Sequence, residues 1–166
     1  CFANQMTMNY LAGIEEDDNS VAVDPAGGKF YTEMEHHWDE AYGYFTDAID
    51  YPTNGTDRFW GKYANNTLEA LLGSATTISE AFRTGRAFIS AGITADVPAQ
   101  VEIIQNEVRR MVAGMAIHYL NRTKQSVADG DPQNKVNHYL SEAWAFIYGI
   151  QFCANPDMTS TEVMDL

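Results

Sequence analysis

Residues 33–45 constrain this chain more than any other segment. They read EMEHHWDEAYGYF, with two adjacent histidines and four acidic residues in the first eight positions. Residues three, four or seven apart share one face of a helix. This spacing predicts a polar stripe of Glu33, His36, Glu40 and Asp47 beside an apolar stripe of Met34, Trp38, Ala41, Tyr42 and Phe45. The segment is therefore expected to be an amphipathic helix that exposes imidazole and carboxylate groups.

Helix signals recur along the rest of the chain. Thr32 and Glu35 have the spacing of a capping box, so a helix is expected to begin there and to run to about Ala48. Apolar residues alternate at spacings of four and three from Val97 onward, which predicts the longest helix, over 97–128 with Asp96 as its cap. The members of this seam are Val97, Val101, Ile104, Val108, Met111 and Met115, followed by His118.

Further helices are expected over 68–72, 74–90 and 132–152, the last with Asp131 as cap and Pro132 at its first position. Ser160 is expected to cap a final turn over 161–166. Glycine, proline and asparagine mark 13–30 and 50–66 as loops, the second with a short turn near Trp60. Sustained period-two alternation is missing. The sequence therefore predicts an all-α fold, an antiparallel helical bundle.

Two regions are expected: residues 1–30 as the end of a preceding helix plus a loop, and residues 31–166 as a bundle domain that lacks an N-terminal half. Cys1 is compatible with a lipidated mature N-terminus, but the helical character of the residues after it favours a fragment. Cys1 and Cys153 are the two cysteines, and they are equally compatible with one disulfide and with two buried thiols.

The charge of the chain restricts its partners. Its 166 residues carry a formal net charge of −13, which argues against binding nucleic acid or an anionic membrane surface. An apolar run near the ~20 residues of a membrane span is missing, so we do not expect the chain to span a membrane. The acidity gives a general attraction for cations, although a solvated acidic surface explains it equally well.

Imidazole and carboxylate groups on one helix face are what a divalent or ferric metal ion would need, or a proton-transfer site. Glu33, His36, His37 and Glu40 are the leading candidate ligands. The alternative is that acids gather at a helix start because they favour the helix dipole. His118, His138 and Glu142 are secondary candidates. His118 lies on an apolar seam, where a histidine is more often a hydrogen-bonded core residue.

The spacing of His36, Glu40 and Tyr42 is echoed by His138, Glu142 and Trp144, which is compatible with a duplicated bundle. Several blocks together resemble an uncharacterised bacterial family, the domain of unknown function 4856. The blocks are Glu35–Phe45, Tyr51–Asn54, Arg58–Tyr63, Ala116–Leu120 and Ser141–Phe146. The resemblance covers residues 30–152. It implies a secreted or lipid-anchored protein of the bacterial cell envelope, periplasmic or in the outer membrane, with another helical half before this region.

In outline the family is similar to imelysins, helical-bundle proteins that are tied to iron acquisition and carry a His-x-x-Glu motif. This similarity implies that the chain is the C-terminal part of an imelysin-like double bundle, with His37 and Glu40 at the motif positions. Imelysins usually have glycine and a small residue before that histidine, whereas this chain has Glu35 and His36.

The leading functional hypothesis is therefore a non-catalytic envelope protein that binds metal, most of all iron, or a metal-bearing ligand for uptake. Its expected partners are the N-terminal half of the same protein and envelope uptake proteins. Two alternatives stay open: a metallopeptidase-like hydrolase with Glu40 as base, and a structural or assembly module in which the histidines only join helices.

Overall fold

The computed structural model describes residues 2–53 and 58–166. Within these ranges it contains helices and turns but no strand, apart from one isolated β-bridge between Asp24 and Lys29. The all-α prediction is confirmed. The chain divides into two compact units, one that ends at Glu107 and one that begins at Val108. Among the described residues, none of the helices is both long and apolar enough to cross a bilayer.

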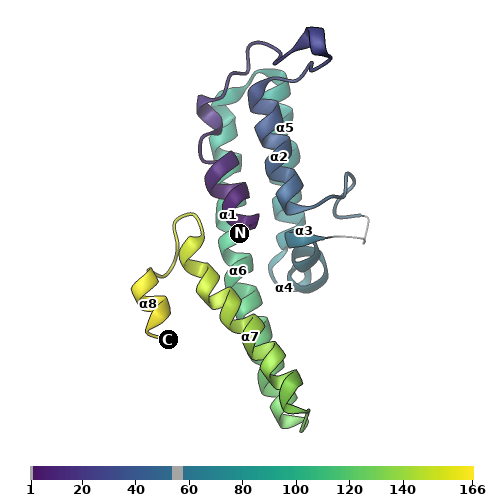
Figure 1. Cartoon of the computed structure of the whole chain (residues 1–166). Helices are drawn as coiled ribbons and strands as arrows, with labels where there is room; N and C mark the ends of the chain where they lie inside the picture. The colour runs from purple at the N-terminus through teal and green to yellow at the C-terminus, as the bar shows by residue number, and fades with distance from the viewer. Residues whose placement is uncertain (1, 54–57) are drawn as a thin grey trace. The chain divides into compact units, whose positions relative to one another are not determined.

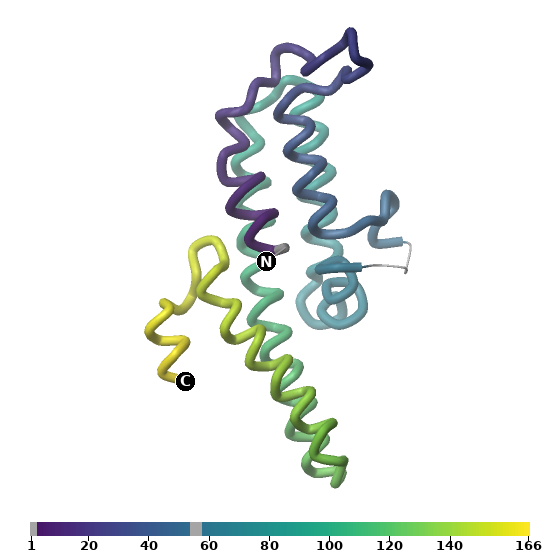
Figure 2. The backbone as a smooth tube through the Cα atoms, viewed as in Figure 1, coloured from purple at the N-terminus to yellow at the C-terminus, as the bar shows by residue number. Residues whose placement is uncertain are grey.

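The first unit contains most of the elements. In chain order they are α1 (Phe2–Asn4), η1 (Gln5–Tyr10), η2 (Ile14–Glu16), η3 (Pro25–Gly27), α2 (Glu33–Phe45), α3 (Phe59–Tyr63), η4 (Ala64–Leu68), α4 (Glu69–Leu72), α5 (Ser74–Ala91) and η5 (Thr94–Asp96), followed by the start of α6 (Val97–Ala128). Helices α2 and α5 lie side by side and run antiparallel, and η1 lies along α2 on another side (Figure 1 and Figure 2).

The second unit is a helical hairpin with a short terminal helix. The rest of α6 packs against α7 (Gln133–Gly149), which continues into η6 (Ile150–Phe152), and α8 (Ser160–Met164) follows. Tyr119 of α6 stacks on Phe146 of α7 with ring centroids 5.7 Å apart. Cys153 is a buried free thiol whose pKa is raised to about 11, first by burial and then by the charge of Asp157. Cys1, its expected alternative partner, lies outside the described residues.

Helix α2 forms as the sequence predicts at its N-terminus. The Thr32 hydroxyl accepts a hydrogen bond from the Glu35 backbone N–H at 3.2 Å, and the Glu35 carboxylate accepts one from the Thr32 N–H at 3.0 Å. The apolar stripe is buried through Met34, Trp38, Ala41 and Phe45. The polar face of α2 is consequently the one that meets solvent and the preceding loop.

Trp38 is the side chain that fixes α2 against α5. Its indole is 1% exposed, its Nε1–H donates to the Phe82 carbonyl oxygen at 3.0 Å, and its ring meets the Phe82 ring edge to face. Gly85, one turn further along α5, leaves the space that the indole occupies, because a Cβ atom built at Gly85 would overlap the indole. The two helices approach closely because one of them carries glycine at this point.

The seam of the longest helix is confirmed, since all six of its expected apolar members from Val97 to Met115 are buried. Several boundaries are wrong. Helix α2 ends at Phe45, so Asp47 lies beyond it and pairs instead with Arg58. The expected loop 50–66 contains α3 and most of η4.

The expected caps also differ in the second unit. Pro132 is the N-cap of α7 rather than its first residue, and the Asp131 carboxylate accepts a hydrogen bond from the Ser126 hydroxyl at 2.7 Å. Thr159, not Ser160, caps α8, because its side chain and that of Glu162 form a capping box. Pro132 and Thr159, each one position from the expected cap, have the backbone conformation that an N-cap requires.

The role of Gly85 can be tested by substitution. We expect Gly85→Ala to lower the free energy of unfolding by roughly 1–3 kcal/mol, because the added methyl group must displace a buried indole. The matched control is Gly43→Ala, another helical glycine, where a Cβ atom meets nothing within 4 Å. That variant should be neutral or gain up to about 1 kcal/mol from helix propensity. Chemical denaturation of both variants measures the difference, and equal stabilities would contradict this account.

Candidate functional site

A cavity of about 340 Å³ opens beside the first turns of α2. One wall is the polar face of the helix, with Glu33, His36 and His37, and the other is the preceding loop. The loop residues that line it are Asp18, Val21, Ala22 and Val23. Three of the four leading candidate ligands therefore line one cavity.

His37 is held by a carboxylate that the sequence did not single out. Its Nδ1 lies 2.7 Å from Oδ2 of Asp17 in the loop, and its ring also contacts the Tyr10 ring with centroids 5.8 Å apart. Because a carboxylate only accepts hydrogen bonds, the proton of this pair resides on Nδ1. In the neutral imidazole, Nε2 then carries the lone pair, which is the arrangement that orients a metal-ligating histidine.

His36 is held more loosely. Its ring stacks on Tyr31 with centroids 5.0 Å apart, and its Nε2 lies 3.7 Å from Oε1 of Glu40, too long for a strong hydrogen bond. The His36 and His37 rings are 5.9 Å apart. The Glu33 carboxylate accepts a hydrogen bond from the Asp18 backbone N–H at 3.3 Å. The two imidazoles are neighbours, but they contact different partners: His36 stacks on Tyr31, and His37 contacts Asp17.

The candidate donors do not gather around one point. Among the residues that the structure describes, no group of three or more His, Cys, Asp or Glu side chains is arranged to hold a metal ion. Glu40, the fourth candidate, lies 3.7 Å from Nε2 of His36 but lines a separate cavity with Tyr10 and Tyr44. The histidine face of α2 can therefore supply one or two donors to a ligand rather than a closed cage.

The secondary candidates lie in the second unit. The His118 ring is half-buried against Tyr119, and its pKa is lowered by desolvation and then by the charge of Arg122. The imidazole therefore favours the neutral form, as in a packed histidine. His138 is exposed beside the Tyr139 ring, and Glu142 is half-buried.

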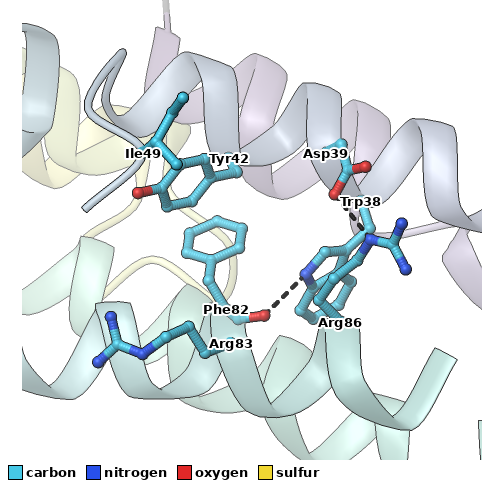
Figure 3. Close-up of a pocket in the computed structure, with 7 residues that line it drawn as sticks. All are labelled: Trp38, Asp39, Tyr42, Ile49, Phe82, Arg83 and Arg86. Atoms are coloured by element: carbon cyan, nitrogen blue, oxygen red, sulfur yellow. Dashed lines mark hydrogen bonds and ion pairs between the residues drawn. The ribbon is translucent and has the colours of Figure 1, made fainter. Parts of the chain in front are cut away.

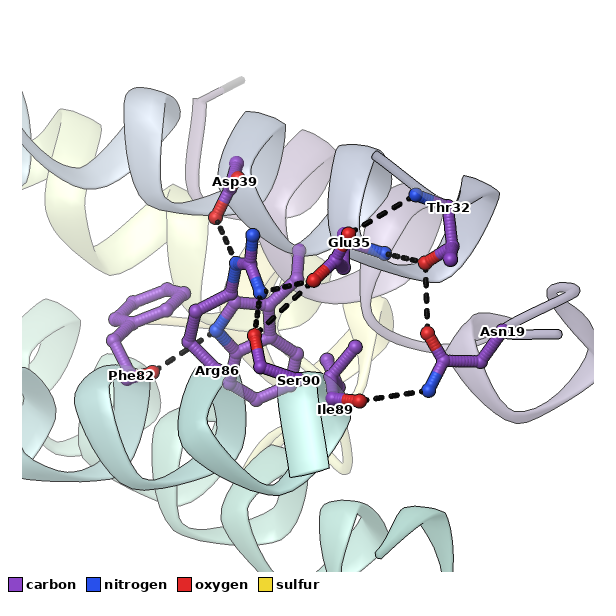
Figure 4. Close-up of polar contacts among 9 residues, drawn as sticks. Asn19, Thr32, Glu35, Asp39, Phe82, Arg86, Ile89 and Ser90 are labelled. Atoms are coloured by element: carbon purple, nitrogen blue, oxygen red, sulfur yellow. Dashed lines mark hydrogen bonds and ion pairs between the residues drawn. The ribbon is translucent and has the colours of Figure 1, made fainter. Parts of the chain in front are cut away.

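A polar network on the opposite edge of α2 sets the position of this site (Figure 4). Arg86 of α5 forms ion pairs with Glu35 at 2.7 Å and Asp39 at 2.9 Å, and it also donates to the Ser90 hydroxyl. Asn19 joins the loop to both helices, because it accepts from the Thr32 hydroxyl at 2.7 Å and donates to the Ile89 carbonyl at 2.8 Å. The network fixes helix and loop together, and these are the two walls of the histidine cavity.

A smaller hollow of about 170 Å³ lies where α2 and α5 meet (Figure 3). Its lining is Trp38, Asp39, Tyr42, Ile49, Phe82, Arg83 and Arg86. The polar groups there already have partners in the protein: the Tyr42 hydroxyl donates to the Ala48 carbonyl at 2.6 Å, and Arg83 donates to the Tyr51 carbonyl at 3.0 Å. This hollow belongs to the packing of the two helices.

Sequence reasoning missed two residues that shape the site, Asp17 and Arg86. Asp17 belongs to an acidic run in a loop, and nothing in its spacing connects it with a histidine twenty positions later. A weak signal for Arg86 was present in the sequence. Arg86 is a basic residue among the apolar positions of α5, and its partners Glu35 and Asp39 are acids on α2.

The fold and the site thus define a class of protein: an all-α protein with an acidic surface and a histidine-lined cavity. The chain matches the model of the family described as Domain of unknown function (DUF4856) over residues 2–165, and it belongs to this family. The resemblance seen in the sequence is confirmed for this family. No curated protein and no solved structure matches the chain.

The Glu35–Arg86 pair gives a prediction for pH. Burial alone would raise the pKa of Glu35, but the hydrogen bonds from Thr32 and Arg86 and the charge of Arg86 outweigh it, and the pKa is lowered. A lowered acid pKa stabilises the fold above the unfolded-state value, and this contribution is lost as the pH falls through the folded-state value.

We therefore expect the free energy of unfolding to fall as the pH is lowered below about 4.5, and to fall less in Glu35→Gln. At pH 7 the same variant should cost about 1–3 kcal/mol, because the Arg86 hydrogen bonds lose their charged acceptor. Urea denaturation from pH 7 to 3 measures both effects. The exposed Glu15→Gln is the control, and identical pH profiles for Glu35→Gln and wild type would contradict the role of the pair.

Proposed function

We propose that this protein is a non-catalytic binding protein of the cell envelope whose histidine cavity takes a metal-bearing ligand, an iron chelate above all. The observation that carries the proposal is the pair of adjacent imidazoles, His36 and His37, on the wall of a cavity of about 340 Å³. Imidazole nitrogen is a ligand for iron and other borderline divalent metals. The Asp17 contact supports the role of His37, since it leaves the lone pair of Nε2 to coordinate a metal.

A chelate suits this site better than a bare ion. A bare transition-metal ion needs at least three protein donors in a fixed geometry, and such a group is missing among the described residues. A chelate brings most of its own donors and leaves one or two coordination positions for imidazole. The cavity also has apolar walls, Val21 and Val23, that can contact the organic part of such a ligand.

The charge of the cavity favours a neutral or cationic complex. Asp18 and Glu33 both line it, and the net charge of −13 adds a general repulsion for anions. The envelope location, the role in iron uptake, and partners among uptake proteins and a preceding helical half of the same protein are part of the proposal. They rest on the outline resemblance to imelysins that the sequence suggests.

Calorimetric titration tests the metal site. With ferric nitrilotriacetate as the probe, we expect one binding event in wild type and an affinity lower by about tenfold or more in His36→Gln/His37→Gln. The matched control is His138→Gln, an exposed histidine in the second unit, which should bind as wild type does. Zinc and ferrous ions alone should bind more weakly than the chelate. Equal heats in wild type and the double variant, or none in either, would overturn the proposal.

Two contacts favour a second candidate, the structural or assembly module. The His37–Asp17 pair and the His36–Tyr31 stack both tie α2 to the segment before it, as expected if the histidines only join elements. In that case the double variant should lower the free energy of unfolding while wild type shows no heat with any metal probe.

A further inference from the structure

A second cavity of α2 lies on the other side of Glu40 and differs in chemistry from the histidine cavity. It measures about 310 Å³, and its lining is Tyr10, Glu40, Gly43, Tyr44 and Phe59. Three of these five residues are aromatic, one is a carboxylate, and one is a glycine that leaves room. None of the lining residues, all of them in the described part of the first unit, is a lysine or arginine.

The aromatic rings come from three elements. Tyr10 ends η1, Tyr44 lies in the last turn of α2, and Phe59 begins α3. The Tyr10 and Tyr44 rings stack with centroids 5.5 Å apart and planes inclined by 29°. Phe59 is 40% exposed, and its backbone has φ of 51°, a conformation that is costly for a bulky side chain. Phe59 thus contributes a partly exposed aromatic ring to the cavity from a strained backbone position.

Glu40 supplies negative charge at the same place. Its carboxylate lies 3.7 Å from Nε2 of His36, and its side chain is 39% exposed. Tyr10 lines the same cavity as Glu40, and its ring stacks on that of Tyr44. The cavity therefore combines aromatic π surfaces with a carboxylate.

We propose that this cavity binds a quaternary or methylated ammonium group. Aromatic faces attract such cations through their quadrupoles, and a nearby carboxylate adds a Coulomb attraction that needs no hydrogen bond from the ligand. An inorganic cation prefers several oxygen ligands, and the cavity offers one carboxylate. An anion would be repelled by Glu40. This assignment goes beyond the metal-bearing ligand of the histidine cavity and uses no metal.

The test uses tetramethylammonium and choline as probes, followed by chemical shifts of the backbone amides in the metal-free chain. We expect saturable shifts at residues 40–44 and near Tyr10, with dissociation constants in the millimolar range. The control ligand is 3,3-dimethylbutan-1-ol, which has the shape of choline without its charge and should bind at least tenfold more weakly. Equal binding of the neutral alcohol, or no saturable shift with either cation, would overturn the assignment.

Substitutions locate the binding. Phe59→Leu and Glu40→Gln should each weaken tetramethylammonium binding by about three- to thirtyfold. The matched control Phe30→Leu removes an exposed ring that does not line the cavity and should bind as wild type does. Circular dichroism establishes that each variant is folded. Undiminished binding in both cavity variants would place the cation elsewhere and overturn the proposal.

Quaternary ammonium groups occur both in free solutes and in lipid headgroups. Choline and phosphocholine represent the free form, and sedimentation with phosphatidylcholine vesicles represents the headgroup. Binding of choline without sedimentation supports a free solute, and Glu40-dependent sedimentation supports a headgroup. Because the test contains no metal and leaves both histidines in place, its failure would not touch the proposal for the histidine cavity.

Discussion

The contact between Trp38 and α5 is the constraint on which the rest of the first unit depends. The indole fills the space left by Gly85 and hydrogen-bonds to the Phe82 carbonyl, so it fixes the distance between two helices and their register together. Edge-to-face aromatic contacts of this kind add about 0.5–1.5 kcal/mol to the burial of the rings. The ion pairs of Arg86 then prevent rotation of α2, because they hold two acids on adjacent turns of its edge.

Once that face of α2 is fixed against α5, the segments that its other faces contact are fixed as well. His36 and His37 meet the loop that carries Asp17, and Glu40 meets the segment that carries Tyr10. Neither arrangement needs a local preference of the histidines or of Glu40. Both follow from a helix whose apolar stripe has only one way to be buried. The candidate ligands therefore face two different cavities, although they lie within two turns of one another.

The sequence was sufficient for several local patterns, although it misplaced the caps of α7 and α8 by one residue. The capping box at Thr32, the buried stripe from Met34 to Phe45 and the seam of α6 all depend on spacing within one helix. Prediction from the sequence failed where a segment distant in the chain determined which residues are in contact. The path of a loop brings Asp17 into contact with His37, and Glu40 lines a cavity with Tyr10. The four candidate ligands that were expected at one point therefore line two different cavities. In the loop expected over 50–66, helical turns formed despite asparagine and glycine, because Ala64 within it and Leu68 just after it are buried.

Glu40 connects the two proposed sites electrostatically. Its carboxylate lies 3.7 Å from Nε2 of His36 on one side and lines a cavity with Tyr10 on the other. Positive charge brought to either side reduces the field that Glu40 exerts on the opposite side, because one carboxylate cannot neutralise two cations fully. Between partly exposed groups such an effect is modest and is screened by salt. A metal complex on His36 and an organic cation against Phe59 would therefore weaken each other at low ionic strength and become nearly independent at high ionic strength. Exchanging Glu40 for glutamine removes the shared charge and with it the coupling.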